Sequence, residues 1–322
     1  MAFMKLLLPA LATVPFALAQ GNGCEYQNEW PLFTNWLYAN AFEKGSPSTP
    51  HIVQNQGDLD VLQSCRTFTG SIQISSGAGG DLSINGIQQI TGDLSANGSS
   101  ASSLSADQLT SIGGHFSLSD LTTLNSLTFN NLQSVGALSF RALPQLSQLG
   151  FGKGITHADS IAITNTALTS VDGIHLQQAS EFSITENQFL NRVNVSGFQN
   201  ATGPISFVGN QDGLNIEFPD LQEAGNITAR NVGEFAVPNL QTLHGLLGLY
   251  QNDFLNFSAP KLSETADVSI NNNTQMSAID LSGLQRCNGG LTISGNNDLR
   301  NISLPNLQQV GGGVDFRGPL DG

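Results

Sequence analysis

The feature that most constrains the fold of this 322-residue chain is a short motif that returns about every 22 residues, a period in the range of known repeat proteins. Each copy holds two hydrophobic residues separated by one residue, usually small, and an asparagine often follows. A recurrence of this length is typical of solenoids, in which each coil buries its apolar side only by stacking on its neighbours. The twelve copies begin at Ile72, Leu94, Phe116, Leu138, Ile161, Phe182, Ile205, Ile227, Leu247, Val268, Leu291 and Val314.

Side chains alternate across a β-strand, so the two hydrophobic residues of each copy point inward and the residue between them points outward. The sequence therefore predicts a mainly β fold, a parallel β-solenoid of about twelve coils with a short helix within Gln56–Cys65. The outward column is dominated by Ser and Thr, which suit either a smooth binding face or an ordinary solvated one. Its members are Gln73, Ser95, Ser117, Ser139, Ala162, Ser183, Ser206, Thr228, Gly248, Ser269, Thr292 and Asp315.

Asparagines recur near the end of this motif, with gaps close to the period of the motif itself. A buried corner must satisfy its backbone groups, and the asparagine side chain carries both an acceptor and donors. The spacing favours a structural ladder over the alternative that asparagine is simply common in turns. The predicted ladder consists of Asn165, Asn187, Asn210, Asn231, Asn252, Asn273 and Asn296.

The first residues resemble an export signal. Lys5 precedes an apolar run from Leu6 to Leu18, and Ala17-Leu18-Ala19 provides a small-x-small cleavage site. No later segment approaches the roughly 20 apolar residues that span a bilayer. We therefore predict a signal peptide over residues 1–19, an N-terminal cap region over 20–66, and the repeat domain over 67–322.

Seven Asn-x-Ser/Thr sequons agree with export, because a secretory chain carries N-glycans at exposed acceptors. Some must be chance matches in a chain rich in Asn, Ser and Thr, and Asn226 adjoins a predicted strand. The candidates are Asn97, Asn194, Asn200, Asn226, Asn256, Asn272 and Asn301.

The chain has three cysteines. Cys24 and Cys65 flank the region before the repeats and are candidates for a disulfide. Cys287 is left over, which in a secreted protein indicates an intermolecular bond, a free thiol or a partner cysteine beyond the chain end. The last strand signal, Val314–Phe316, lacks a C-terminal cap in this sequence, so we expect a longer product to supply a cap and a cysteine.

The charge pattern excludes some functions. Only 11% of the residues are charged and the net charge is −14, which argues against electrostatic binding of nucleic acid. The five histidines form no zinc-type spacing, and we expect no metal site and no cofactor. The acids at equivalent strand positions, Asp93, Glu181, Asp267 and Asp315, are scattered among the coils, whereas a polysaccharide hydrolase or lyase needs clustered catalytic groups. We therefore expect no catalytic residues.

Two groups of motifs resemble a known family. The segment Ile52–Ser75 is similar to the opening of receptor L-type domains. The repeats that contain Leu304-Pro-Asn-Leu307, Val310-Gly-Gly312 and Ile293-Ser-Gly-Asn-Asn297 are similar to fungal cell-wall-organisation proteins related to sporulation-specific wall proteins. The resemblance implies a right-handed, leucine-rich-repeat-like β-solenoid that is glycosylated and exported. Members of that family usually carry a glycosylphosphatidylinositol anchor, whose attachment signal does not occur in this sequence.

The leading hypothesis is a non-enzymatic surface glycoprotein that helps to organise the fungal wall through its solenoid faces. Its expected place is extracellular, in the wall or at the outer plasma-membrane surface. Its expected partners are wall polysaccharides or wall glycoproteins. A receptor-like module for an extracellular ligand is the second hypothesis, and a wall-polysaccharide hydrolase or lyase is the third.

Overall fold

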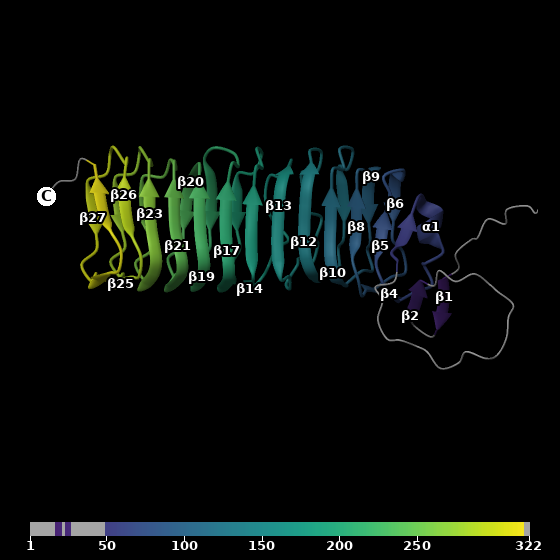
Figure 1. Ribbon diagram of the computed structural model, residues 1–322. Helices are drawn as coiled ribbons and strands as arrows, with labels where there is room; N and C mark the ends of the chain where they lie inside the picture. Colours follow the sequence, from purple (N-terminus) through teal and green to yellow (C-terminus); the bar gives the residue numbers. More distant parts are fainter. Residues whose placement is uncertain (1–16, 21–22, 27–48, 319–322) are drawn as a thin grey trace, which may run out of the picture.

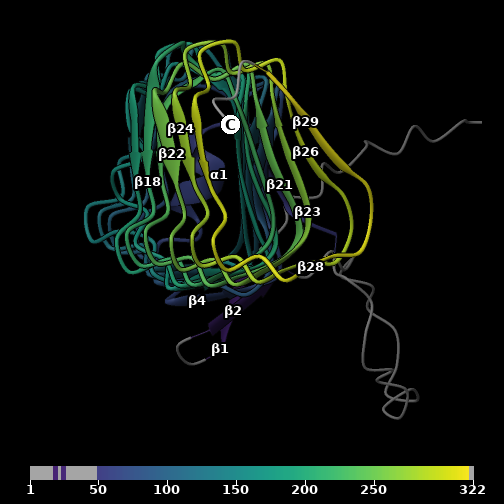
Figure 2. The ribbon, with the colours of Figure 1, turned by 90° about the vertical axis from the view of Figure 1, so that its left-hand side faces the viewer.

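The computed structural model describes residues 49–318 in full and, for residues 17–20 and 23–26, the backbone alone. The chain winds into a long stack of coils, which Figure 1 shows from the side and Figure 2 along its axis. Strand pairing is parallel except for one antiparallel pair at the N-terminal end, and one helix occurs in the described residues. The predicted parallel β-solenoid of about twelve coils is therefore confirmed. Its handedness stays a prediction.

The largest surface of the stack, which we call the main wall, is formed by one strand from each coil. The hydrophobic pair of every predicted motif copy lies in one of these strands. The main-wall strands are β3 (His51–Val53), β5 (Ile72–Ile74), β8 (Leu94–Asn97), β10 (Ser111–Ser119), β12 (Ser134–Leu143), β13 (Ser160–Thr166), β15 (Glu181–Thr185), β17 (Asn200–Val208), β19 (Glu223–Arg230), β21 (Thr242–Tyr250), β23 (Glu264–Asn271), β26 (Leu291–Ser294) and β29 (Val314–Arg317). Strand β3 pairs in register with β5, so the wall begins one strand before the first predicted copy.

Two further walls close each coil. The lower wall runs along the bottom of Figure 1 and contains the first residues of the long main-wall strands together with β4 (Thr67–Thr69), β7 (Gln89–Ile90), β14 (Gln178–Ala179), β25 (Arg286–Cys287) and β28 (Gln309–Val310). The second wall lies across the coil from the main wall, where Figure 2 labels β18, β22 and β24. Its strands are β6 (Gly79–Ser83), β9 (Ser100–Ser105), β11 (Ser126–Thr128), β16 (Arg192–Asn194), β18 (Leu214–Glu217), β20 (Val232–Ala236), β22 (Asn256–Ser258), β24 (Ala278–Asp280) and β27 (Asn301–Ser303).

The core fills the space between the walls with stacked aliphatic and aromatic side chains. Phe182, Phe207 and Phe218 are fully buried, and their ring centroids lie 5.6 to 6.2 Å apart. A single coil is too small to form a hydrophobic core by itself, so the core is formed by such contacts between coils.

The N-terminal end of the stack carries the helix. Helix α1 (Gln56–Asp60) begins at Asn55, whose side chain accepts the N–H of Gly57, and Asp58 completes a capping box. It is shorter than the predicted segment, because the chain after Asp60 continues as turns. Strands β1 (Ala17–Gln20) and β2 (Gly23–Tyr26) form an antiparallel pair, and β2 continues the lower wall beside β4. The remainder of the predicted signal peptide and most of the predicted cap region lie outside the described residues.

At the other end, Val314 and Phe316 of β29 are 56% and 40% exposed, whereas the equivalent residues of the inner coils are buried. The predicted C-terminal cap falls on no described residue and stays a prediction.

Candidate binding surface

The outward column of the main wall lies in one continuous register. Ser117 pairs with Ser95 on one side and with Ser139 on the other, and the alignment continues in this way from Gln73 to Asp315. Most of these side chains are half-buried. The hydroxyl groups of Ser117 and Ser139 have no hydrogen-bond partner among the described residues. The main wall therefore presents a flat, polar and largely uncharged strip.

Two of the acids in or beside this strip, Asp93 and Asp267, accept backbone N–H groups. Asp315 instead bonds the side chain of Arg317, and Glu181 has no hydrogen-bond partner among the described residues. Asp93 accepts the N–H of His115 at 2.7 Å, and Asp267 accepts the N–H of Gly290 at 2.7 Å. Asn226 occupies the equivalent place in its coil and accepts the N–H of Leu246 at 2.8 Å. Each of these side chains satisfies a donor in the next coil close to the point where the strand pairing shifts register.

Five of the seven predicted ladder asparagines share one buried register, namely Asn187, Asn210, Asn252, Asn273 and Asn296. Each side chain accepts a backbone N–H from the preceding coil, as Asn296 does from Asn273 at 2.8 Å. Each also donates to a main-wall carbonyl of the preceding coil, as Asn296 does to Ile270 at 2.8 Å. The asparagine ladder therefore links the corner of each of these coils to the preceding coil by hydrogen bonds.

The other two asparagines, Asn165 and Asn231, lie outside the ladder. They sit one residue earlier in their coils, at corners with φ of 53° and 59°. The ladder positions of those coils hold Thr166 and Val232, whose N–H groups donate to Asn187 and Asn252 at 3.0 Å. The prediction from spacing therefore assigned residues from two adjacent corner positions to one ladder.

The predicted glycosylation sites are spread over all three walls. Asn97, Asn226, Asn256, Asn272 and Asn301 are exposed, and Asn194 and Asn200 are half-buried. Their occupancy stays a prediction.

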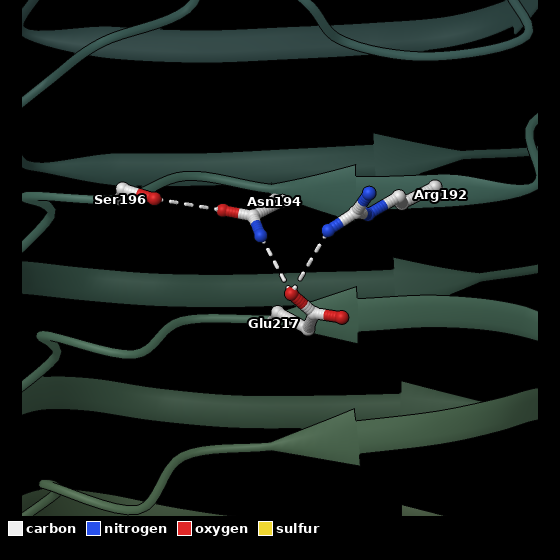
Figure 3. A network of polar contacts seen from close by, with 4 residues as sticks. All are labelled: Arg192, Asn194, Ser196 and Glu217. Carbon is white, nitrogen blue, oxygen red and sulfur yellow. Dashed lines mark hydrogen bonds and ion pairs between the residues drawn. The ribbon is translucent and has the colours of Figure 1, made fainter.

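One sequon is part of a polar network on the second wall, shown in Figure 3. Ser196 donates to Oδ1 of Asn194 at 3.0 Å, and Nδ2 of Asn194 donates to Glu217 at 2.5 Å. Arg192 donates to the same carboxylate oxygen at 3.2 Å. An N-glycan at Asn194 would be attached to the nitrogen that contacts Glu217, and this nitrogen would then keep a single N–H for the contact.

The cysteines differ in state. Cys65 is disulfide-bonded, but the side chain of Cys24 lies outside the described part, so their pairing stays a prediction. Cys287 is a free, fully buried thiol, and its burial raises its pKa. A thiol in this state stays protonated and unreactive near neutral pH.

Residues 49–318 hold no group of three or more His, Cys, Asp or Glu side chains that could bind a metal ion. Among the same residues, no helix has the length and apolar character needed to cross a bilayer.

Sequence reasoning missed a second regular column, on the lower wall. One outward residue of each coil, directly after an inward hydrophobic residue, forms what we call the glutamine row. The coil before the row holds Arg66 in the same register, and the row itself runs from the next coil onward: Gln88, Thr110, Gln133, Thr156, Gln177, Gln199, Gln222, Gln241, Ser263, Gln285 and Gln308. Their spacing follows the period of the main motif and was a usable signal, but exposed polar residues leave no hydrophobic pattern to draw attention to them.

The fold and these walls define a solenoid repeat protein whose surface is made of regular polar columns. Comparison with known proteins narrows this class. Protein ecm33 of Aspergillus fumigatus is 42% identical over 322 residues, which is all of this chain and 75% of that protein. A cell surface GPI-anchored protein of Arthroderma benhamiae is 40% identical over 242 residues, 75% of this chain and 62% of that protein. Cell wall protein ecm33 of Schizosaccharomyces pombe is 30% identical over 221 residues, 67% of this chain and 52% of that protein.

The chain therefore belongs to the ecm33 family of fungal cell-wall and cell-surface proteins. This confirms the resemblance to fungal wall proteins. Two sporulation-specific proteins of Saccharomyces cerevisiae also match, at 29% and 30% identity. The names of these relatives describe wall, surface or sporulation proteins and no enzyme. No protein-family model and no solved structure matches the chain.

Proposed function

We propose that this protein is a non-enzymatic, exported surface glycoprotein that contributes to the organisation and integrity of the fungal wall. The observation that carries the proposal is the main wall itself, a continuous in-register polar strip on a chain of the ecm33 family. The chain spans between 52% and 75% of the length of the three relatives compared above, so the activity of a whole family member reaches this chain only as part of the proposal.

The structural roles of the polar groups support a scaffold over a catalyst. Catalysis by a pair of carboxylates requires two acids that face the same substrate bond. Asp93 and Asp267 are instead held by backbone N–H groups of their neighbouring coils. A scaffold requires only a surface that is long, rigid and able to form many hydrogen bonds, and the repeated walls provide such a surface.

The decisive test is genetic. Deletion of the gene in the encoding fungus should increase sensitivity to wall-perturbing dyes and to osmotic shock, and the intact gene should restore resistance. A matched test of the protein incubates it with β-glucan, chitin and pectin, from which we expect no released product. Normal wall resistance in the deletion strain would refute a role in wall integrity. Turnover that is lost on replacing one Asp or Glu would refute the non-enzymatic assignment.

A further inference from the structure

The glutamine row is fixed at the backbone and free at the side chain. Gln199, Gln222 and Gln241 donate their backbone N–H groups to the row residue of the preceding coil, each at 2.8 Å. Parallel strands bonded in this way stand about 4.8 Å apart. Eight of the eleven row members are glutamines, so the row repeats one kind of side chain along the solenoid axis.

The row's hydroxyl residues and its glutamines use their side chains differently. Thr110, Thr156 and Ser263 each donate their hydroxyl to the carbonyl of the preceding row residue, at 2.9, 3.2 and 3.0 Å. The eight glutamine side chains have no hydrogen-bond partner among the described residues, and all but the half-buried Gln133 are exposed. The carboxamides therefore form no hydrogen bond that stabilises the described fold, and the exposed ones are accessible to a ligand.

The chemistry of the row favours a neutral ligand rich in hydroxyl groups. A carboxamide offers two donors and an acceptor without a charge, which suits hydroxyl groups that also donate and accept. The outward column next to the row, one residue further along each coil, pairs Gln178, Asn200, Glu223, Thr242, Glu264 and Arg286 in register. Of the three charged residues among these, Glu264 and Arg286 bond each other at 2.8 Å and so offset their charges, and Glu223 lies 3.9 Å from His244. The net charge of −14 disfavours a polyanion.

A protein partner fits the same surface less well. Protein interfaces are centred on apolar and aromatic anchors with few charges. The large exposed hydrophobic residues of the described chain are Ile52, Val61, Phe189, Leu255, Val314 and Phe316. None of these residues belongs to the glutamine row or to the outward column beside it.

We propose that the glutamine row binds a linear, neutral polysaccharide that lies along the solenoid axis, with successive carboxamides contacting successive sugars. The proposal rests on the wall function proposed above and names the partner and the surface. Single hydrogen bonds to an exposed amide are weak in water, so affinity comes from many coils binding one polymer at once. The row should therefore bind long polymers much more tightly than short oligosaccharides.

The test uses the whole purified protein and a panel of linear β-1,3-glucan, β-1,6-glucan, chitin and α-mannan, with polygalacturonate as a polyanion. The variant combines Gln199→Ala, Gln222→Ala and Gln241→Ala, which removes three adjacent carboxamides. The matched control combines Ser126→Ala, Thr128→Ala and Asn215→Ala, three second-wall residues whose side chains have no hydrogen-bond partner among the described residues. We expect the wild type to bind at least one neutral polymer and the glutamine variant to bind it about tenfold more weakly, with the control unchanged.

A second variant guards against misfolding. Gln199→Glu, Gln222→Glu and Gln241→Glu keep the side-chain shape but replace each NH₂ donor group by a charged acceptor, and we expect the same loss of binding with an unchanged melting temperature. Unchanged affinity in both glutamine variants would overturn the proposal. Equal loss in the second-wall control, or wild-type protein that binds only polygalacturonate or none of the polymers, would overturn it as well. Because the deletion phenotype is measured separately, wall integrity can hold while polysaccharide binding fails.

Discussion

At the scale of single residues, Asn273 shows what the buried ladder contributes. Its Oδ1 atom accepts the backbone N–H of Asn252 at 2.8 Å, and its Nδ2 atom donates to the carbonyl of Leu249 at 3.1 Å. Alanine at this position leaves both buried backbone groups without these partners, at a cost of about 1–3 kcal/mol each. We expect Asn273→Ala to lower the free energy of unfolding by about 3 kcal/mol, measured from the midpoint of a urea titration.

Asn215 provides the control for this substitution. It is an exposed asparagine of β18, and its side chain has no hydrogen-bond partner among the described residues. Asn215→Ala should change stability by less than about 0.5 kcal/mol. If both variants lost a similar free energy of unfolding, the ladder hydrogen bonds would contribute no more to stability than an exposed asparagine does.

The ladder also shows where sequence reasoning stops at this scale. Asparagine is favoured at the corner occupied by Asn165 and Asn231, because it tolerates positive φ, and at the next residue, because its amide satisfies buried backbone groups. The distance between successive motif copies itself varies from coil to coil, so spacing cannot separate two positions that are adjacent in the chain. The glutamine row was missed for a different reason, since its side chains neither pack nor bond within the fold.

At the scale of strands, neighbouring coils approach closely where the main-wall strands shift register. In β19, a Cβ atom added to Gly225 would lie 2.7 Å from the carbonyl oxygen of Gly203 in the preceding coil. The obstacle is backbone, which cannot swing away as a flexible side chain would. We expect Gly225→Ala to destabilise the protein by about 1–3 kcal/mol, measured as a lower melting temperature.

Gly313 is the matched control, because an added Cβ atom there meets no heavy atom within 4 Å. Gly313→Ala should leave the melting temperature unchanged or slightly raised, since alanine restricts the unfolded chain. If the Gly225→Ala protein were as stable as the wild type, the adjacent coils would be able to move apart at Gly225 without a loss of stability.

The strands themselves could be predicted well, because their inward residues repeat. Ile161 and Ile163, for example, are fully buried on the main wall while Ala162 between them faces outward. The register shifts could not be predicted from this pattern. They depend on which backbone groups approach one another between coils, and a glycine in the sequence does not reveal which residue of the adjacent coil lies against it.

At the scale of the whole molecule, the stability should depend on acid. Three carboxylates have a pKa below its ordinary value, each because of hydrogen bonds within its wall. Ser103 and Ser102 lower the pKa of Asp81, Arg286 and Asn288 lower that of Glu264, and Ser282 lowers that of Asp280.

A lowered folded-state pKa means that the carboxylate stabilises the fold above its unfolded pKa, and that this contribution is lost as the pH falls through the folded value. We therefore expect a constant melting temperature between about pH 7 and pH 5 and a fall below about pH 4. The net charge of −14 acts in the opposite direction, because protonation relieves self-repulsion. Measurement at about 0.15 M salt screens that repulsion beyond about 8 Å and leaves the short hydrogen bonds to dominate.

The combined variant Asp81→Asn, Glu264→Gln and Asp280→Asn should flatten the acid limb of this profile, because it removes the three groups that must be protonated. Its melting temperature near pH 7 should be lower than that of the wild type, and the two proteins should converge as the pH falls. A wild-type melting temperature that rises on acidification would show that charge repulsion across the walls outweighs the bonds between coils. In that case the stack would owe little to the polar groups on its surface, and its stability would rest on the apolar columns and the buried asparagines.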